Sequence, residues 1–98
     1  MKLSGVEIEN SKTGETEEIT LDGLFISIGR EPATEMFKGQ VDLDESGYIV
    51  ADESTRTNIP GVFAVGDVRT KVLRQIVTAA ADGAVASHYV EQFLAENK

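Results

Sequence analysis

Residues 57–67, Thr-Asn-Ile-Pro-Gly-Val-Phe-Ala-Val-Gly-Asp, constrain the fold of this chain more than any other stretch. The Pro-Gly pair has the composition of the centre of a type II turn, because proline presets φ and glycine accepts a positive φ. The four apolar residues 62–65 predict a short buried strand that ends at Gly66 and Asp67. A strand that ends in a glycine and a carboxylate just before a helix favours a ligand-binding site at that junction.

The segment after this junction predicts a long helix. An alanine-rich pattern runs over about residues 73–94, with Tyr89 and Phe93 on one side. The opposite face, at a spacing of 3.6 residues, carries Leu73, Ile76, Val77, Ala80, Ala84 and Ser87. We therefore expect the helix to be contacted from two directions. Gly83 costs about 1 kcal/mol of helix propensity relative to alanine, so a tight contact is expected there.

The N-terminal third predicts sheet structure. Residues 2–10 and 17–21 alternate between apolar and polar on either side of a Ser-Lys-Thr-Gly turn, which indicates a β-hairpin. Residues 24–28, Leu-Phe-Ile-Ser-Ile, form an apolar run that is typical of a strand covered on both faces. The run ends at Gly29, and the proline at position 32 forces the chain to leave the sheet extended. With a short strand expected at residues 48–50, the pattern indicates an α/β fold.

Composition excludes several classes of function. The 98 residues suit one domain with a modest core, and their formal net charge is −8. Nucleic acids and anionic membrane surfaces need a basic face, so neither is an expected partner. No apolar run approaches the roughly 20 residues of a membrane span. The chain has no cysteine, and its single histidine, His88, lacks a second ligand at zinc spacing, so no metal site is expected.

Three blocks of the sequence resemble the two-dinucleotide flavoprotein reductases. Residues 24–32, Leu-Phe-Ile-Ser-Ile-Gly-Arg-Glu-Pro, resemble the strand that ends the pyridine-nucleotide domain of that family. Residues 57–67 are similar to its second flavin-binding motif. Residues 74–83, Arg-Gln-Ile-Val-Thr-Ala-Ala-Ala-Asp-Gly, are most similar to the following segment of low-molecular-weight thioredoxin reductases. Order and spacing agree as well, and the resemblance covers essentially all of the chain.

The resemblance implies an FAD site around the Gly-Asp junction. Gly66 would let the backbone approach the ribityl–pyrophosphate portion, and Asp67 would accept a hydrogen bond from a ribityl hydroxyl. The Gly-Asp pair without its flanking blocks favours a turn residue at Asp67 that caps the connection. Arg74, Gln75 and Ile76 would line the flavin ring. The partial positive charge of the helix N-terminus would favour the anion that forms on the ring when the flavin is reduced. The full implied set is Gly66, Asp67, Val68, Arg74, Gln75 and Ile76.

The resemblance also has implications for Ile76, for the NAD(P)H contacts and for the domain boundaries. Many relatives are expected to carry alanine where this chain has Ile76, a change that a backbone contact would tolerate. Ile28 and Gly29, at the end of the first block, are implied NAD(P)H contacts. The first block would place residues 1–31 at the end of the NAD(P)H-binding domain. Residues 32–98 would then form the C-terminal half of the FAD-binding domain.

The missing motifs define the expected fold and extent. The Gly-x-Gly-x-x-Gly strands for FAD and NADPH are absent, as is the Cys-x-x-Cys pair that passes electrons to thioredoxin. We therefore expect a C-terminal fragment of an FAD/NAD(P)-binding Rossmann-like, three-layer domain, with an N-terminal β-hairpin or meander and a long C-terminal helix. Met1 is then a truncated start, and the chain alone is expected to lack catalytic residues and reductase turnover.

In an intact enzyme, the resemblance implies electron transfer from NADPH through FAD to a dithiol outside this chain. Thioredoxin or a similar small dithiol protein would be the partner, in the cytoplasm. Alternatives within the family are a peroxide-reductase flavoprotein subunit and a ferredoxin–NADP reductase. An alternative of another class is a stand-alone, non-catalytic packing module, whose open sheet edges would favour a homodimer.

Overall fold

The computed structural model describes all of residues 1–98 and divides into two compact units, Met1–Arg30 and Glu31–Lys98. The expected assignment of residues 1–31 and 32–98 to two different nucleotide-binding domains stays a prediction. No helix in either unit has the combination of length and apolar sequence that crossing a membrane requires.

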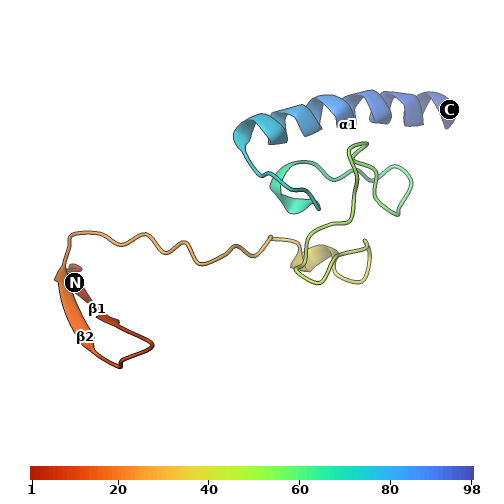
Figure 1. The fold of residues 1–98 in the computed structure, drawn as a ribbon. Helices are drawn as coiled ribbons and strands as arrows, with labels where there is room; N and C mark the ends of the chain where they lie inside the picture. The colour runs from red at the N-terminus through yellow and green to blue at the C-terminus, as the bar shows by residue number, and fades with distance from the viewer. The chain divides into compact units, whose positions relative to one another are not determined.

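The first unit contains the expected β-hairpin. Strands β1 (Gly5–Glu9) and β2 (Thr16–Thr20) pair antiparallel, with Val6 opposite Ile19 (Figure 1). Their connection is held by Asn10, whose side-chain oxygen accepts hydrogen bonds from the backbone N–H groups of residues 12 and 13. This local pairing confirms the hairpin prediction.

The strand expected at residues 24–28 does not form, so that prediction is wrong for this structure. The segment has no regular hydrogen bonding, and the side chains of Phe25 and Ile28 are 98% and 95% exposed. A strand needs neighbours to satisfy its backbone N–H and C=O groups. The apolar run contains the side chains for burial on both faces, but no strand pairs with it within the unit. The sequence pattern thus indicates that both faces of this segment are buried, but no part of the unit covers them.

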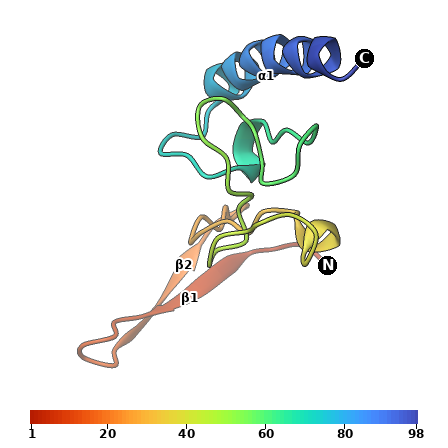
Figure 2. The same cartoon turned by 90° about the vertical axis from the view of Figure 1, so that its right-hand side faces the viewer.

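The second unit has irregular loops packed against one long helix. It contains the 3-10 helices η1 (Glu35–Phe37) and η2 (Gly66–Val68) and the helix α1 (Ile76–Glu96). The loops containing η2 lie along one side of α1 in both views (Figures 1 and 2). The small apolar core consists of Val41, Ile49, Ala51 and Ala64, with Leu43, Ile59 and Val68 packed against it.

The two short strands expected in this unit reduce to isolated bridges. Ile49 bridges Leu43 and Arg69, and Phe63 bridges Arg56. The segments are extended, but each meets its neighbour over a single residue pair, too short to make a ladder. The predicted turn before residue 62 is confirmed, because the N–H of Val62 donates to the Ile59 carbonyl at 3.1 Å.

Helix α1 forms as predicted, but it packs on the side of Tyr89 and Phe93 alone, so the expected contact from two directions is wrong here. Its buried residues are Asp82 and Ala86, followed along the same side by half-buried Tyr89 and Phe93. The predicted apolar face is exposed, with Ile76 91% exposed, and the space around Gly83 is open. The expected tight contact at Gly83 is therefore wrong here. The loops pack against the Tyr89 side of α1 because Asp82 and the Phe93 ring make their contacts there. The aliphatic stripe lies on the opposite side of the helix.

Candidate functional site

The Gly-Asp junction forms the tight turn η2, which lies against the beginning of α1. Gly66 has a φ of +75°, a backbone conformation that favours glycine. A β-carbon at this position would lie 3.6 Å from that of Ala79 on the helix. The N–H of Gly66 donates to Oδ2 of Asp82 at 2.9 Å. The turn is thus tied to the helix through its backbone, while Asp67 is exposed.

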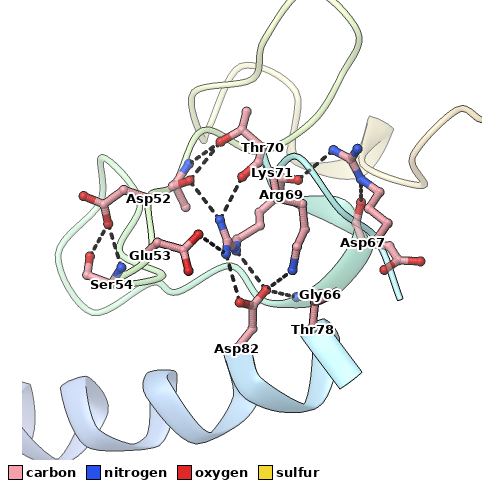
Figure 3. A network of polar contacts seen from close by, with 12 residues as sticks. Asp52, Glu53, Ser54, Gly66, Asp67, Arg69, Thr70, Lys71, Thr78 and Asp82 are labelled. Atoms are coloured by element: carbon pink, nitrogen blue, oxygen red, sulfur yellow. Dashed lines mark hydrogen bonds and ion pairs between the residues drawn. The ribbon is translucent and has the colours of Figure 1, made fainter. Parts of the chain in front are cut away.

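Asp82 is the centre of a buried ion network (Figure 3). Its carboxylate pairs with Arg69 through two hydrogen bonds, from Nε at 2.8 Å and Nη2 at 2.9 Å. The ammonium of Lys71 lies 2.7 Å from Oδ2. Arg69 is 2% exposed and Asp82 is 4% exposed. Removing charges from water is costly, so this pairing is what permits both groups to be buried.

The remaining donors of Arg69 also have partners. Nη1 donates to the carbonyl oxygens of Thr70 at 2.8 Å and Ala51 at 3.4 Å, and Nη2 donates to the exposed Glu53 at 3.1 Å. Hydrogen bonding from Arg69, with smaller contributions from Lys71 and the Gly66 N–H, holds the pKa of Asp82 well below its usual range despite burial. The Asp82 hydrogen bonds likewise raise the pKa of Arg69. Both side chains are therefore charged at neutral pH.

Arg74 lies across the junction but uses its donors within the protein. Nε donates to the carbonyl oxygen of Asp67 and Nη2 to that of Arg69, both at 3.0 Å. The guanidinium carbon stands 3.7 Å from the centroid of the Tyr48 ring, within the range of a cation–π interaction. Its guanidinium therefore braces the η2 loop in this structure.

The start of α1 leaves backbone donors available. Thr78 fixes the helix boundary, since its hydroxyl accepts a hydrogen bond from the N–H of Gln75 at 3.0 Å. The first N–H groups of an α-helix have no intrahelical acceptor, and they carry the positive end of its dipole. Gln75 and Ile76 are exposed at this end. The arrangement presents N–H donors close in sequence to the turn that carries Asp67.

The sequence matches a known protein family. The family model for pyridine nucleotide-disulphide oxidoreductases matches residues 2–83. The chain belongs to that family. It is 53% identical over 95 residues to a thioredoxin reductase of Streptomyces clavuligerus, covering 96% of this chain and 30% of the relative. It is also 45% identical over 93 residues to a 34.2 kDa protein of the rubredoxin operon of Clostridium pasteurianum, covering 95% of this chain and 30% of that protein.

Solved structures agree with this assignment. The crystal structure of Lactococcus lactis thioredoxin reductase matches with a TM-score of 0.84 and 46% identity, over 95% of this chain and 31% of that one. This member of the pyridine nucleotide-disulphide oxidoreductases thus has the fold of part of an FAD/NAD(P)-binding Rossmann-like domain. It spans about 30% of the length of the curated relatives it matches.

The structure brings the predicted FAD residues together in the second unit. Gly66, Asp67 and Val68 are the three residues of η2, and Arg74 bonds to that turn just before α1 begins. Val68 is half-buried against the apolar core. The two residues predicted to contact NAD(P)H, Ile28 and Gly29, belong to the other unit. Whether any of these residues touches a nucleotide stays a prediction.

Sequence reasoning missed the ion network and the partner of Arg74. Asp82 is the one charged residue in the small-residue run from Ala79 to Ala86, and this isolation was a usable signal. A lone carboxylate among alanines on a packed helix requires a cationic partner. Arg74, Lys71 and Arg69 are the nearest cationic residues before it in the sequence, and the structure pairs Asp82 with Lys71 and Arg69. Tyr48 lies 26 residues before Arg74, and nothing in the sequence linked the two.

Proposed function

We propose that this chain is the C-terminal portion of an NADPH-dependent thioredoxin reductase and supplies part of its FAD site. Residues 1–31 would end the NAD(P)H-binding domain, and residues 32–98 would form the C-terminal half of the FAD-binding domain. The curated relatives named thioredoxin reductase support this function. When bound, FAD would supply the electron transfer between NADPH and a dithiol.

The observation that carries the proposal is the coupling of η2 to the start of α1. The Gly66 N–H bonds to Asp82 on α1, and Arg74, just before α1, bonds to the carbonyl of Asp67. These contacts therefore hold the exposed carboxylate of Asp67 in a fixed position relative to the N–H donors at the start of α1. A polyol needs an acceptor such as a carboxylate, and an electron-rich ring edge needs donors, so the residues present fit FAD.

Each residue would have a defined task in this site. Asp67 points away from the ion network and would accept a hydrogen bond from a ribityl hydroxyl (Figure 3). Because the Gln75 N–H is bonded to Thr78, the Gln75 side-chain amide and the Ile76 N–H would donate to the pyrimidine edge of the ring. Arg74 would position the turn and would meet the ring with its aliphatic stem, because its guanidinium is bonded to protein. Ile28 and Gly29 would contact NAD(P)H, and thioredoxin or a similar dithiol protein would be the acceptor.

FAD affinity of the longer protein tests the proposal. The apoprotein with Asp67→Asn is expected to bind FAD roughly tenfold more weakly or worse, because an acceptor for a hydroxyl is weakened at an otherwise intact turn. Binding is measured by quenching of flavin fluorescence on titration. Asp42→Asn, another exposed aspartate, is the matched control and should bind as wild type does. Equal affinity of the Asp67 and Asp42 variants would reject the assigned site.

A further inference from the structure

The buried network of Asp82, Arg69 and Lys71 has no role in the proposed contacts with FAD. All its charges are satisfied within the protein, and its side chains are nearly inaccessible to solvent. Yet it includes the N–H of Gly66, which immediately precedes the ribityl-binding candidate Asp67. We propose that Asp82 is a positioning residue for the flavin site. This inference rests on the function proposed above.

The contacts of Asp82 explain how a carboxylate on a helix can orient a loop. Oδ2 receives three donors, from the Gly66 backbone, Arg69 and Lys71, at 2.9, 2.8 and 2.7 Å. Oδ1 receives the second Arg69 hydrogen bond at 2.9 Å. A carboxylate with both oxygens bonded in different directions has little rotational freedom. The N–H of Gly66, and with it the Val65–Gly66 peptide at the start of the turn that carries Asp67, is therefore held in a fixed direction relative to α1.

The backbone of η2 turns at a glycine, so contacts are needed to hold its conformation. Val65 is extended, with a φ of −130°, and the next residue, Gly66, turns to +75°. A glycine has more alternative conformations than any other residue, so this turn is defined by its contacts. Arg74 holds the turn through the Asp67 carbonyl, and Asp82 holds it through the Gly66 N–H. Asp82 thus holds the N–H at the start of the turn, and Arg74 holds the carbonyl of the next residue.

The alternative is that the network stabilises the fold and has no influence on the flavin site. Three variants of the longer protein separate the two. Asp82→Leu removes the carboxylate and leaves Arg69 buried without its partner. The double variant R69M/D82L removes both charges of the Arg69–Asp82 pair and leaves Lys71 without its partner. Apolar replacement of a buried ion pair is often neutral for stability, so the remaining cost should come mainly from Lys71. Arg56→Met is the matched control, since Arg56 contacts α1 at Tyr89, away from the turn.

The measurements are the midpoint of urea unfolding and the Kd for FAD. Asp82→Leu should lower both stability and FAD affinity. In R69M/D82L the midpoint should recover part of the way toward wild type, because Arg69 no longer leaves an unpaired charge while Lys71 does. The Kd should remain raised roughly tenfold, because the Gly66 N–H still lacks its acceptor. A positioning role also predicts faster amide hydrogen exchange at Gly66 in both Asp82 variants. Arg56→Met should leave the Kd for FAD and the Gly66 exchange unchanged.

Recovery of FAD affinity in step with stability in R69M/D82L would overturn the positioning role, as would unchanged exchange at Gly66. These results are distinct from a failure of the proposed function. If Asp67→Asn binds FAD as wild type does, the flavin site itself is misassigned. If Asp67→Asn weakens binding but R69M/D82L does not, the site stands and only the role of Asp82 is rejected.

Discussion

The guanidinium of Arg74 lies over the ring of Tyr48, 3.7 Å from its centroid. The same group donates hydrogen bonds to the carbonyl oxygens of Asp67 and Arg69. It therefore joins three loop segments just before α1 begins. A residue that the sequence suggested as a ligand contact is used first to hold the candidate site in shape.

Arg74→Met is expected to lower the free energy of unfolding by about 1–2 kcal/mol. Methionine retains much of the aliphatic stem but loses both hydrogen bonds to the loop carbonyls and the cation over Tyr48. Urea unfolding monitored by circular dichroism measures the change. A double-mutant cycle with Tyr48→Leu isolates the ring interaction. Arg30→Met, at an exposed position, is the control, and an Arg74 variant as stable as that control would contradict this role.

The stability conferred by Asp82 should depend on pH with a defined sign. Its carboxyl pKa is depressed in the folded state, chiefly by the Arg69 hydrogen bonds. The stabilisation is therefore fully present above the unfolded-state pKa of about 4 and is lost as pH falls toward the lower folded-state pKa. The difference in unfolding free energy between wild type and Asp82→Asn should be largest near pH 7 and shrink below about pH 4. A pH-independent difference would show that the charge of Asp82 is unimportant, and Asp42→Asn provides the baseline.

Alanine substitutions should rank three glycines by their surroundings. Gly66→Ala forces an L-residue into a positive φ, at a cost of about 1–2 kcal/mol. Gly61→Ala should cost more, because its φ is also positive and the new β-carbon would lie 2.9 Å from the Phe93 ring. Gly23→Ala meets open space without a positive φ and should be nearly neutral. Thermal or urea denaturation of the three variants gives the order, and equal effects at Gly66 and Gly23 would argue against the turn described for η2.

Gly83→Ala should stabilise the 98-residue chain by roughly 0.5–1 kcal/mol. Alanine has the higher helix propensity, and nothing lies within 4 Å of the position of the added methyl group. The reverse change, Ala84→Gly at the neighbouring exposed position, should destabilise by a similar amount. The measurement is the urea midpoint of each variant. Destabilisation by Gly83→Ala would reveal a close contact at this face, as the sequence pattern alone suggested.

The hairpin, the Pro-Gly turn and the long helix were predictable because each depends on residues close together in the sequence. Alternating side chains and turn residues specify β1 and β2, and Thr78 and the alanine-rich run specify α1. The run at residues 24–28 shows the limit of such reasoning. Its apolar residues indicate burial on two faces, yet a strand exists only where another strand pairs with it. None does so here.

The face of α1 that packs was equally beyond the sequence pattern. The aliphatic stripe that contains Ile76 has the stronger hydrophobic signal, but Tyr89, Phe93 and Asp82 make the contacts. The choice depends on where the loops bearing Arg69 and Gly61 meet the helix. The helical periodicity of the sequence defines two possible packing faces of α1, but it does not say which face the loops contact.

By itself, the sequence determined the local elements, the acidic composition and the Gly-Asp junction before a helix, because these follow from backbone preferences over a few residues. It also contained the motifs that place the chain among the pyridine nucleotide-disulphide oxidoreductases. Only the tertiary structure decided that Asp82 holds Gly66 and that Arg74 lies over Tyr48. Those pairs lie 16 and 26 residues apart in the chain, and burial of charge and directional hydrogen bonds act between atoms that only folding brings together.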